Sequence, residues 1–80
     1  MRITYDREAD ALYIELRRAT PADSLDLEEG VTADLDAEGH VIGLEVLDVR
    51  ERLGHDALTS VVLEQLPLMI QDPTPAKGMG

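Results

Sequence analysis

Short runs in which apolar and polar residues alternate are the feature that most constrains this chain. Ile3 and Tyr5 alternate with polar neighbours, and Leu12 and Ile14 do the same after the polar stretch Asp6–Asp10. A period of two places the apolar side chains on one face of a strand, so each run predicts a half-buried β-strand. Two such runs around a short polar link predict a β-hairpin.

Three further runs extend the pattern. Residues 25–27 alternate within a charged stretch typical of an edge strand, and residues 31–35 form a fourth run. Val41–Leu47 is the most hydrophobic run and is apolar on both faces except at Gly43 and Glu45. A strand of that kind usually lies in the middle of a sheet, or is covered by a helix or a second subunit.

Helical signals follow the last strand. Asp48, with Glu51 three residues later, has the spacing of a capping box, and Gly54 is suited to end a short helix. A second helix is predicted after Asp56, with Pro67 as its stop. Its helically spaced residues are Leu58, Val61, Val62, Gln65 and Leu66.

The predicted fold class is therefore α+β. We expect a small antiparallel β-sheet meander of about four to five strands, followed by one or two C-terminal helices. Residues 1–71 are predicted to form a single compact domain. Residues 72–80 contain two Pro and two Gly and are predicted to be a disordered tail.

Composition limits how this domain can be stabilised. A chain of 80 residues has a marginal core, and the absence of Cys rules out disulfides and thiolate metal sites. A carboxylate-bound metal or a second subunit remains possible. The net charge of −10 argues against binding nucleic acid, because such a surface repels phosphates. No run is apolar enough for a membrane span or a signal peptide, so the cytoplasm is the expected location.

Several spaced motifs together resemble a known family. Tyr5-Asp6-x-Glu8-x-Asp10-x-Leu12-Tyr13-Ile14 is followed by Gly30-Val31 and then by Asp34-x-Asp36-x-Glu38-Gly39-x-Val41-x-Gly43-x-Glu45-Val46-Leu47. The order and spacing over roughly residues 2–53 resemble the small prokaryotic domain-of-unknown-function family 2283. The resemblance implies a compact antiparallel sheet followed by helical structure. It implies no catalytic residues, because the family has no settled activity.

The stretch Asp34–Glu45 resembles a calcium-binding loop. Carboxylates occupy its first, third and fifth positions, Gly the sixth and Glu the twelfth. An EF-hand needs flanking helices, whereas both flanks here alternate with period two, so a charged hairpin is the simpler interpretation. The alternative is a divalent-metal-binding or metal-dependent hydrolytic protein. Its ligands would be Asp34, Asp36, Glu38 and Glu45.

A second acidic group lies in the first turn. Asp6, Glu8 and Asp10 could act as paired carboxylates in acid–base chemistry, but a solvated turn favours a structural role in which Asp accepts backbone hydrogen bonds. The two histidines, His40 and His55, occupy predicted turns and lack metal-ligand spacing. The chain has no Gly-x-Ser-x-Gly, Ser-x-x-Lys or phosphate-loop motif. These features favour a protein that is not an enzyme and needs no cofactor.

The preferred functional hypothesis is a non-enzymatic protein–protein interaction module that acts as a homodimer. A narrower version is an antitoxin-like or regulatory protein that holds a basic partner. Its contacts would be Asp6, Glu8, Asp10, Asp34 and Asp36. A third possibility is a small-ligand-binding dimer whose pocket lies between the subunits and is lined by Tyr5, Tyr13 and the apolar faces.

Overall fold

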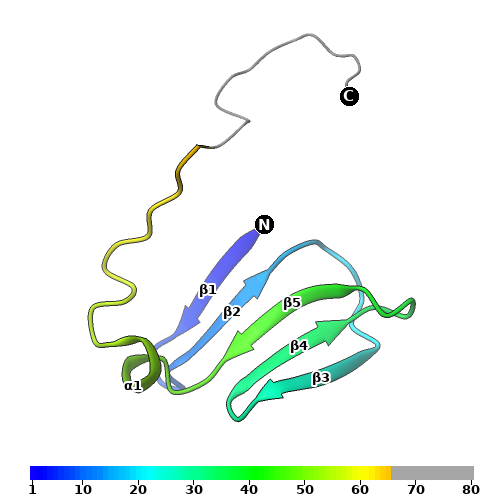
Figure 1. Ribbon diagram of the computed structural model, residues 1–80, viewed down its shortest axis with the longest axis horizontal. Coiled ribbons are helices and arrows are strands. Elements are labelled where there is room, and N and C mark those ends of the chain that lie inside the picture. Colours follow the sequence, from blue (N-terminus) through cyan, green and yellow to red (C-terminus); the bar gives the residue numbers. More distant parts are fainter. Residues whose placement is uncertain (66–80) are drawn as a thin grey trace, which may run out of the picture.

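The computed structural model describes residues 1–65 and contains an antiparallel five-stranded sheet with a short helix at one end (Figure 1). The strands are β1 (Arg2–Asp6), β2 (Ala11–Glu15), β3 (Asp23–Glu28), β4 (Val31–Leu35) and β5 (Val41–Val46), and the helix is α1 (Val49–Leu53). This arrangement confirms the predicted α+β fold class. No helix among residues 1–65 is long and apolar enough to cross a membrane.

The strand order is β1-β2-β5-β4-β3, with every neighbouring pair antiparallel. The central position of β5 confirms the prediction made for Val41–Leu47. Residues 16–22 connect β2 to β3 along the end of the sheet that carries the β4–β5 turn (Figure 1). Backbone hydrogen bonds hold this connection: Leu16 donates to the Ile42 carbonyl at 2.8 Å, and Ala22 to the Leu35 carbonyl at 2.8 Å.

The register separates the side chains onto two faces. One row crosses all five strands with apolar residues only, in the order Ile3, Ile14, Leu44, Ala33 and Leu25. The neighbouring row is polar or charged throughout, in the order Thr4, Tyr13, Glu45, Thr32 and Asp26. Because successive residues of a strand point to opposite sides, the sheet has an apolar face and a polar face.

Few side chains are fully buried. Within residues 1–65 the buried hydrophobic residues are Leu12, Ala33, Ile42 and Val49. Ile42 is the extra residue where the β4–β5 register shifts, and Val49 belongs to α1 at one end of the sheet. The core is therefore small and is built by a single layer with a helical turn at its end.

The helix is capped differently from the prediction. Asp48 precedes it, but this residue has a left-handed backbone (φ 54°) and its side chain makes no capping hydrogen bond, so the predicted capping box is wrong. Asp10 from the β1–β2 turn takes that role, since its carboxylate accepts the Arg50 N–H at 3.2 Å and its carbonyl accepts the Val49 N–H at 3.1 Å. Gly54 ends the helix with φ 102°, as predicted.

The second predicted helix does not form within the described residues. Residues 55–59 make turns, and no helix follows up to Gln65. A short helix depends on packing of its apolar face, and the exposed, β-branched Val61 and Val62 have none here. The predicted helix end at Leu66, the stop at Pro67 and the tail over 72–80 lie outside the described residues.

Candidate functional site

The apolar face of the sheet leaves large hydrophobic side chains exposed to water. Its central residues Ile14 and Leu44 are half-buried, whereas Ile3 on β1 keeps 46% of its surface exposed and Leu25 on β3 keeps 52%. Val41 and Leu27 are similarly exposed. Large apolar residues gathered on one face mark a surface that excludes water only when something covers it.

The polar face is organised around a position in β5 that has no side chain. Gly43 has no side chain, and the ring of Tyr13 from β2 lies over it, so that the Tyr13 hydroxyl donates to Asp34 Oδ2 on β4 at 2.8 Å. A Cβ atom on Gly43 would lie 2.5 Å from Tyr13 Cζ, which is too close for van der Waals contact. The glycine therefore allows a tyrosine to bridge two strands that are not neighbours.

This bridge changes the acidity of the tyrosine. Partial burial, the hydrogen bond to Asp34 and the carboxylates of Glu15 and Glu45 together raise the pKa of Tyr13 to about 12. The hydroxyl thus stays a neutral donor across the physiological range. Tyr13 is therefore not suited to abstract a proton as a tyrosinate, and its contact with Asp34 is a structural hydrogen bond.

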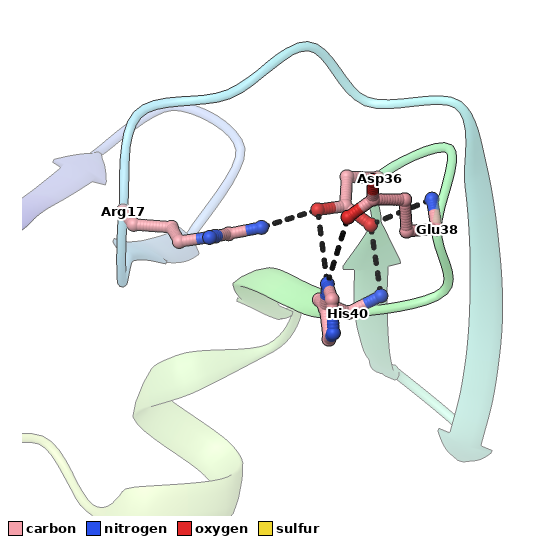
Figure 2. A network of polar contacts seen from close by, with 4 residues as sticks. All are labelled: Arg17, Asp36, Glu38 and His40. Carbon is pink, nitrogen blue, oxygen red and sulfur yellow. Dashed lines mark hydrogen bonds and ion pairs between the residues drawn. The ribbon is translucent and has the colours of Figure 1, made fainter.

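Asp36 organises the β4–β5 turn. Its Oδ1 accepts the N–H groups of Glu38 and His40, each at 2.9 Å, and its Oδ2 forms an ion pair with Arg17 from the β2–β3 connection (Figure 2). The two backbone hydrogen bonds and the arginine lower the pKa of the Asp36 carboxyl. The side chain is thus engaged on both oxygens within its own chain.

The predicted metal ligands are only partly brought together. Among the described residues, the histidine and carboxylate groups close enough to share an ion are Asp36, Glu38 and His40, with ligand atoms within 4.8 Å of one another. Asp34 is held by Tyr13, and Glu45 lies opposite Thr32 in the middle of β5. The flanking elements are strands, which confirms the charged hairpin.

Arg17 would compete with any cation bound at this turn. Figure 2 shows its guanidinium paired with Asp36, the carboxylate that a divalent cation on Asp36, Glu38 and His40 would also use. His40 Nδ1 lies 3.5 Å from Asp36 Oδ2 and 3.6 Å from Glu38 Oε1, too far for direct hydrogen bonds of good geometry. The three ligand atoms are nevertheless within 4.8 Å of one another, so they are close enough to share a small cation, and Arg17 already balances part of the Asp36 charge.

The opposite end of the sheet has its own polar network. The Tyr5 hydroxyl donates to Asp10 Oδ1 at 2.6 Å, and Arg50 Nε lies 3.4 Å from the same oxygen. The hydrogen bond from Tyr5, together with Arg50, lowers the pKa of the Asp10 carboxyl. The same hydrogen bond raises the pKa of the Tyr5 hydroxyl, because ionised Tyr5 could no longer donate it. Arg52 reaches the other way, donating to the Leu47 carbonyl at 3.0 Å and to Glu28 at 3.1 Å. α1 therefore joins the β1–β2 and β3–β4 turns.

The acidic residues predicted to contact a partner fall into two separated groups. Asp6, Glu8 and Asp10 lie in or beside the β1–β2 turn near α1, whereas Asp34 and Asp36 lie at the far end of β4 (Figure 1). Asp6 accepts the N–H groups of Glu8 and Ala9, at 2.9 and 3.2 Å, which confirms its predicted structural role in the turn. The two groups do not form one continuous acidic patch.

The two tyrosines also lie apart. Tyr5 pairs with Leu12 and Tyr13 pairs with Thr4, so the two rings are on opposite faces of the sheet. Within one chain they therefore do not line a common pocket, and the predicted pocket between two subunits stays a prediction. A hollow of about 780 Å³ does lie beside Tyr5, between the β1–β2 turn, α1 and residues 54–59. Arg7, Glu8, Arg50 and His55 line it, and this mixture of charges favours neither an anion nor a cation.

Fold and surface together define a small α+β domain, with one apolar and one polar sheet face and no assembled catalytic group in its described part. The chain belongs to the family of proteins of unknown function DUF2283, whose model matches residues 2–50. That match covers all five strands of the described sheet and the first two residues of α1, and it confirms the resemblance found in the sequence. No curated protein and no solved structure matches the chain.

Sequence reasoning missed the arginines and the glycine that arrange these contacts. Arg17 pairs with Asp36, which lies 19 residues away in the sequence. Arg52 pairs with Glu28, which lies 24 residues away, and no local pattern predicts either pair. Gly43 was a usable signal, because an isolated glycine within a strand indicates a close approach. Its partner, Tyr13, could be named only once the register was known.

Proposed function

We propose that the protein is a non-enzymatic protein–protein interaction module that acts as a homodimer, with the apolar face of the sheet covered by a second copy. The single observation that carries this proposal is the apolar row from Ile3 to Leu25, whose ends are about half exposed. A catalytic or cofactor-dependent role would need an assembled catalytic group or a cofactor site, and no contact among the described residues favours such a role.

The physical reason is that one layer cannot form a domain core. Stable domains pack a sheet against a helix layer or a second sheet, because one face of each sheet must be removed from water. In residues 1–65 only α1 packs against the sheet, and it contributes one buried side chain, Val49. A second copy supplies the missing layer with the same surface.

Symmetry and charge favour this partner over a different protein. A two-fold axis lying in the plane between two stacked sheets would bring the apolar row of one copy against the same row of the other. This is the symmetry of the commonest class of oligomer. Each chain carries a net charge of −10, but Glu45, Thr32 and Asp26 lie on the opposite face and would point away from the contact. Added salt should therefore strengthen the dimer, by screening repulsion between two acidic chains.

Sedimentation equilibrium of the full chain at micromolar concentration tests the proposal. We expect twice the chain mass of 8.8 kDa, with dissociation on dilution. A mass of 8.8 kDa at all micromolar concentrations would contradict the homodimer.

Two adjacent residues of β1 give a matched pair of variants. Ile3→Asp puts a charge on the apolar face, whereas Thr4→Asp puts the same charge on the polar face, and both positions are exposed on an edge strand. We expect Ile3→Asp to weaken the dimer by more than about tenfold, since a buried carboxylate must be desolvated, and Thr4→Asp to leave it within about twofold. Equal effects of the two variants would show that the contact does not involve this face.

A further inference from the structure

The two edges of the sheet differ in their charges. β3 at one edge carries three carboxylates, from Asp23, Asp26 and Glu28, and no basic residue. β1 at the other edge carries one residue of each sign, Arg2 and Asp6. An exposed edge strand presents unpaired backbone groups that can pair with another chain, and like charges along the edge oppose such pairing. Of the two edges, β1 is therefore the one whose charges allow it to pair with a second copy of itself.

The outer edge of β1 is open in the described part of the chain. All of its residues except Tyr5 are exposed. Within residues 1–65, backbone hydrogen bonds join β1 to β2 and to no other segment. Residues 60–65 run past this side of the sheet without pairing with it (Figure 1). The outward N–H and C=O groups of β1 are thus available to another strand.

The sequence of β1 determines how two copies would pair. Residues that face each other across antiparallel strands point to the same side of the sheet, so apolar positions must meet apolar positions. A two-fold axis at Thr4 satisfies this rule, and the pairs across it are Arg2 with Asp6, Ile3 with Tyr5, and Thr4 with Thr4 of the other copy. Moving the axis by one residue in either direction separates Arg2 from Asp6. The charges therefore select the axis at Thr4.

Each pair in this register is of a favourable kind. Cross-strand pairs of opposite charge, of an aromatic with a β-branched residue and of two threonines all stabilise a sheet. The two-fold axis repeats the Arg2–Asp6 and Ile3–Tyr5 pairs on both sides of the central Thr4 pair. Asp6 uses Oδ1 for both of its turn hydrogen bonds, so its Oδ2 can accept the guanidinium of the other copy.

We propose that β1 is a second self-association surface, at which two copies pair antiparallel about Thr4 and their five-stranded sheets form one sheet of ten strands. The axis of this edge contact is perpendicular to the sheet, whereas the axis of the face contact lies between stacked sheets, so the apolar face stays free. Together the two contacts close into a tetramer with D2 symmetry, a common form of soluble oligomer. The edge contact stands without the proposed function, whereas the tetramer rests on it.

Cross-linking through a single cysteine tests the edge contact, and the absence of Cys makes the link specific. Directly opposite residues of antiparallel strands have Cα atoms about 4.5–5.5 Å apart, a separation that a disulfide spans. Thr4 lies on the polar face, outside two stacked sheets, so the face contact cannot bring two copies of Thr4 together.

The matched control is a cysteine on the polar face of the other edge strand. We expect the full-length Thr4→Cys chain to form disulfide-linked pairs under mild oxidation at least about tenfold faster than the Ser24→Cys chain, because pairing raises the local thiol concentration. Equally slow cross-linking of the two chains would overturn the edge contact. A dimeric mass in those samples would leave the face contact standing.

Charge variants test the register. In the Thr4→Cys chain, Arg2→Glu places like charges opposite each other and should slow cross-linking by at least about fivefold. Arg18→Glu makes the same change in the exposed β2–β3 connection and should leave the rate unchanged. Adding Asp6→Asn to Arg2→Glu removes the repulsion, while the amide oxygen still accepts the turn N–H groups, so part of the rate should return. Equal rates in all of these chains would overturn the register.

The mass of the cross-linked protein separates the edge contact from the homodimer. Sedimentation equilibrium should give the mass of four chains of 8.8 kDa, that is, two disulfide-linked pairs held face to face. A mass of two chains would keep the edge contact and overturn the face contact. Without the disulfide, the edge is a small interface, so wild-type tetramers should form only above the micromolar range in which the homodimer is tested.

Discussion

On the polar face of the sheet, side chains find partners within one chain: Tyr13 donates to Asp34 across Gly43, and the Thr32 hydroxyl lies 3.3 Å from Asp26. On the apolar face, a row crosses all five strands and ends in half-exposed residues. A hydrogen bond needs only two well-placed atoms, whereas an apolar surface needs a whole layer to exclude water. One small chain can therefore complete the first face alone but not the second.

The largest effect is expected from a polar residue in the centre of the apolar row. Leu44→Asn should lower the free energy of unfolding by about 2–4 kcal/mol, because it removes apolar contacts and buries an amide. Glu45→Asn, one residue further and on the opposite face, should change it by less than about 0.5 kcal/mol. Urea denaturation at one fixed protein concentration measures both, since the stability of a dimer depends on concentration. Similar losses for the two variants would contradict the difference between the faces.

A smaller loss is expected from Gly43→Ala. The added Cβ forces the Tyr13 ring off β5, and the hydrogen bond to Asp34 breaks, at a cost of about 1–2 kcal/mol. The same substitution in a Tyr13→Ala background should cost almost nothing, because the ring is no longer there to be displaced. A double-mutant cycle of urea denaturations measures this coupling, and independent, additive effects would show that Gly43 does not serve Tyr13.

Tyr13→Phe keeps the ring and removes only the hydroxyl, so we expect a loss of about 1 kcal/mol at neutral pH. The raised pKa sets the alkaline behaviour: the contribution of the hydroxyl is fully present below pH 10, the ordinary tyrosine value, and is lost as the pH rises through about 12. Ultraviolet titration should show a tyrosinate step near pH 12 that is missing in the variant. Tyr5 titrates in both proteins, so only the step that the substitution removes belongs to Tyr13. Loss of a step at the ordinary tyrosine value, with the step near pH 12 retained, would contradict the bridge.

The smallest effect is expected at the turn. The lowered pKa of Asp36 means that its contribution is present above the ordinary aspartate value and is lost as the pH falls through the folded-state value. Asp36→Asn still accepts the two turn N–H groups but loses the charge facing Arg17. Its melting temperature should therefore fall less steeply than that of the wild type on acidification, and its loss at neutral pH should be smaller than that of Tyr13→Phe. Parallel curves would indicate that the ion pair does not stabilise the turn.

The sequence allowed prediction of features that depend on neighbouring residues. Alternation identified the strands, and the two-sided apolar run of Val41–Leu47 correctly placed β5 in the middle of the sheet. The alternation pattern could not reveal that β5 lies between β2 and β4, because that strand order depends on pairing between distant parts of the chain. The same limit explains the helix cap: Asp48 had the right spacing, but Asp10, 40 residues away from Arg50, accepts the bond.

The acidic site residues illustrate the same point. The spacing of a calcium loop is present in Asp34, Asp36, Glu38 and Glu45. In the structure, however, Asp34 accepts the Tyr13 hydroxyl and Glu45 lies opposite Thr32, so neither joins the group at the turn. The part of the prediction that survived is the hairpin, which follows from period two. The ion pair with Arg17 could not be anticipated, since it depends on where the β2–β3 connection passes.

The central position of β5 also has a consequence for the order of folding. The β1–β2 and β3–β4 hairpins can each form from neighbouring residues, but β5, which among residues 1–65 is the last strand made, pairs with both and joins them. As the chain emerges during synthesis, the two hairpins must wait until Val46 is available before the sheet can close. Until then the edges of β2 and β4 that pair with β5 are open, which exposes this interval to aggregation and to chaperones.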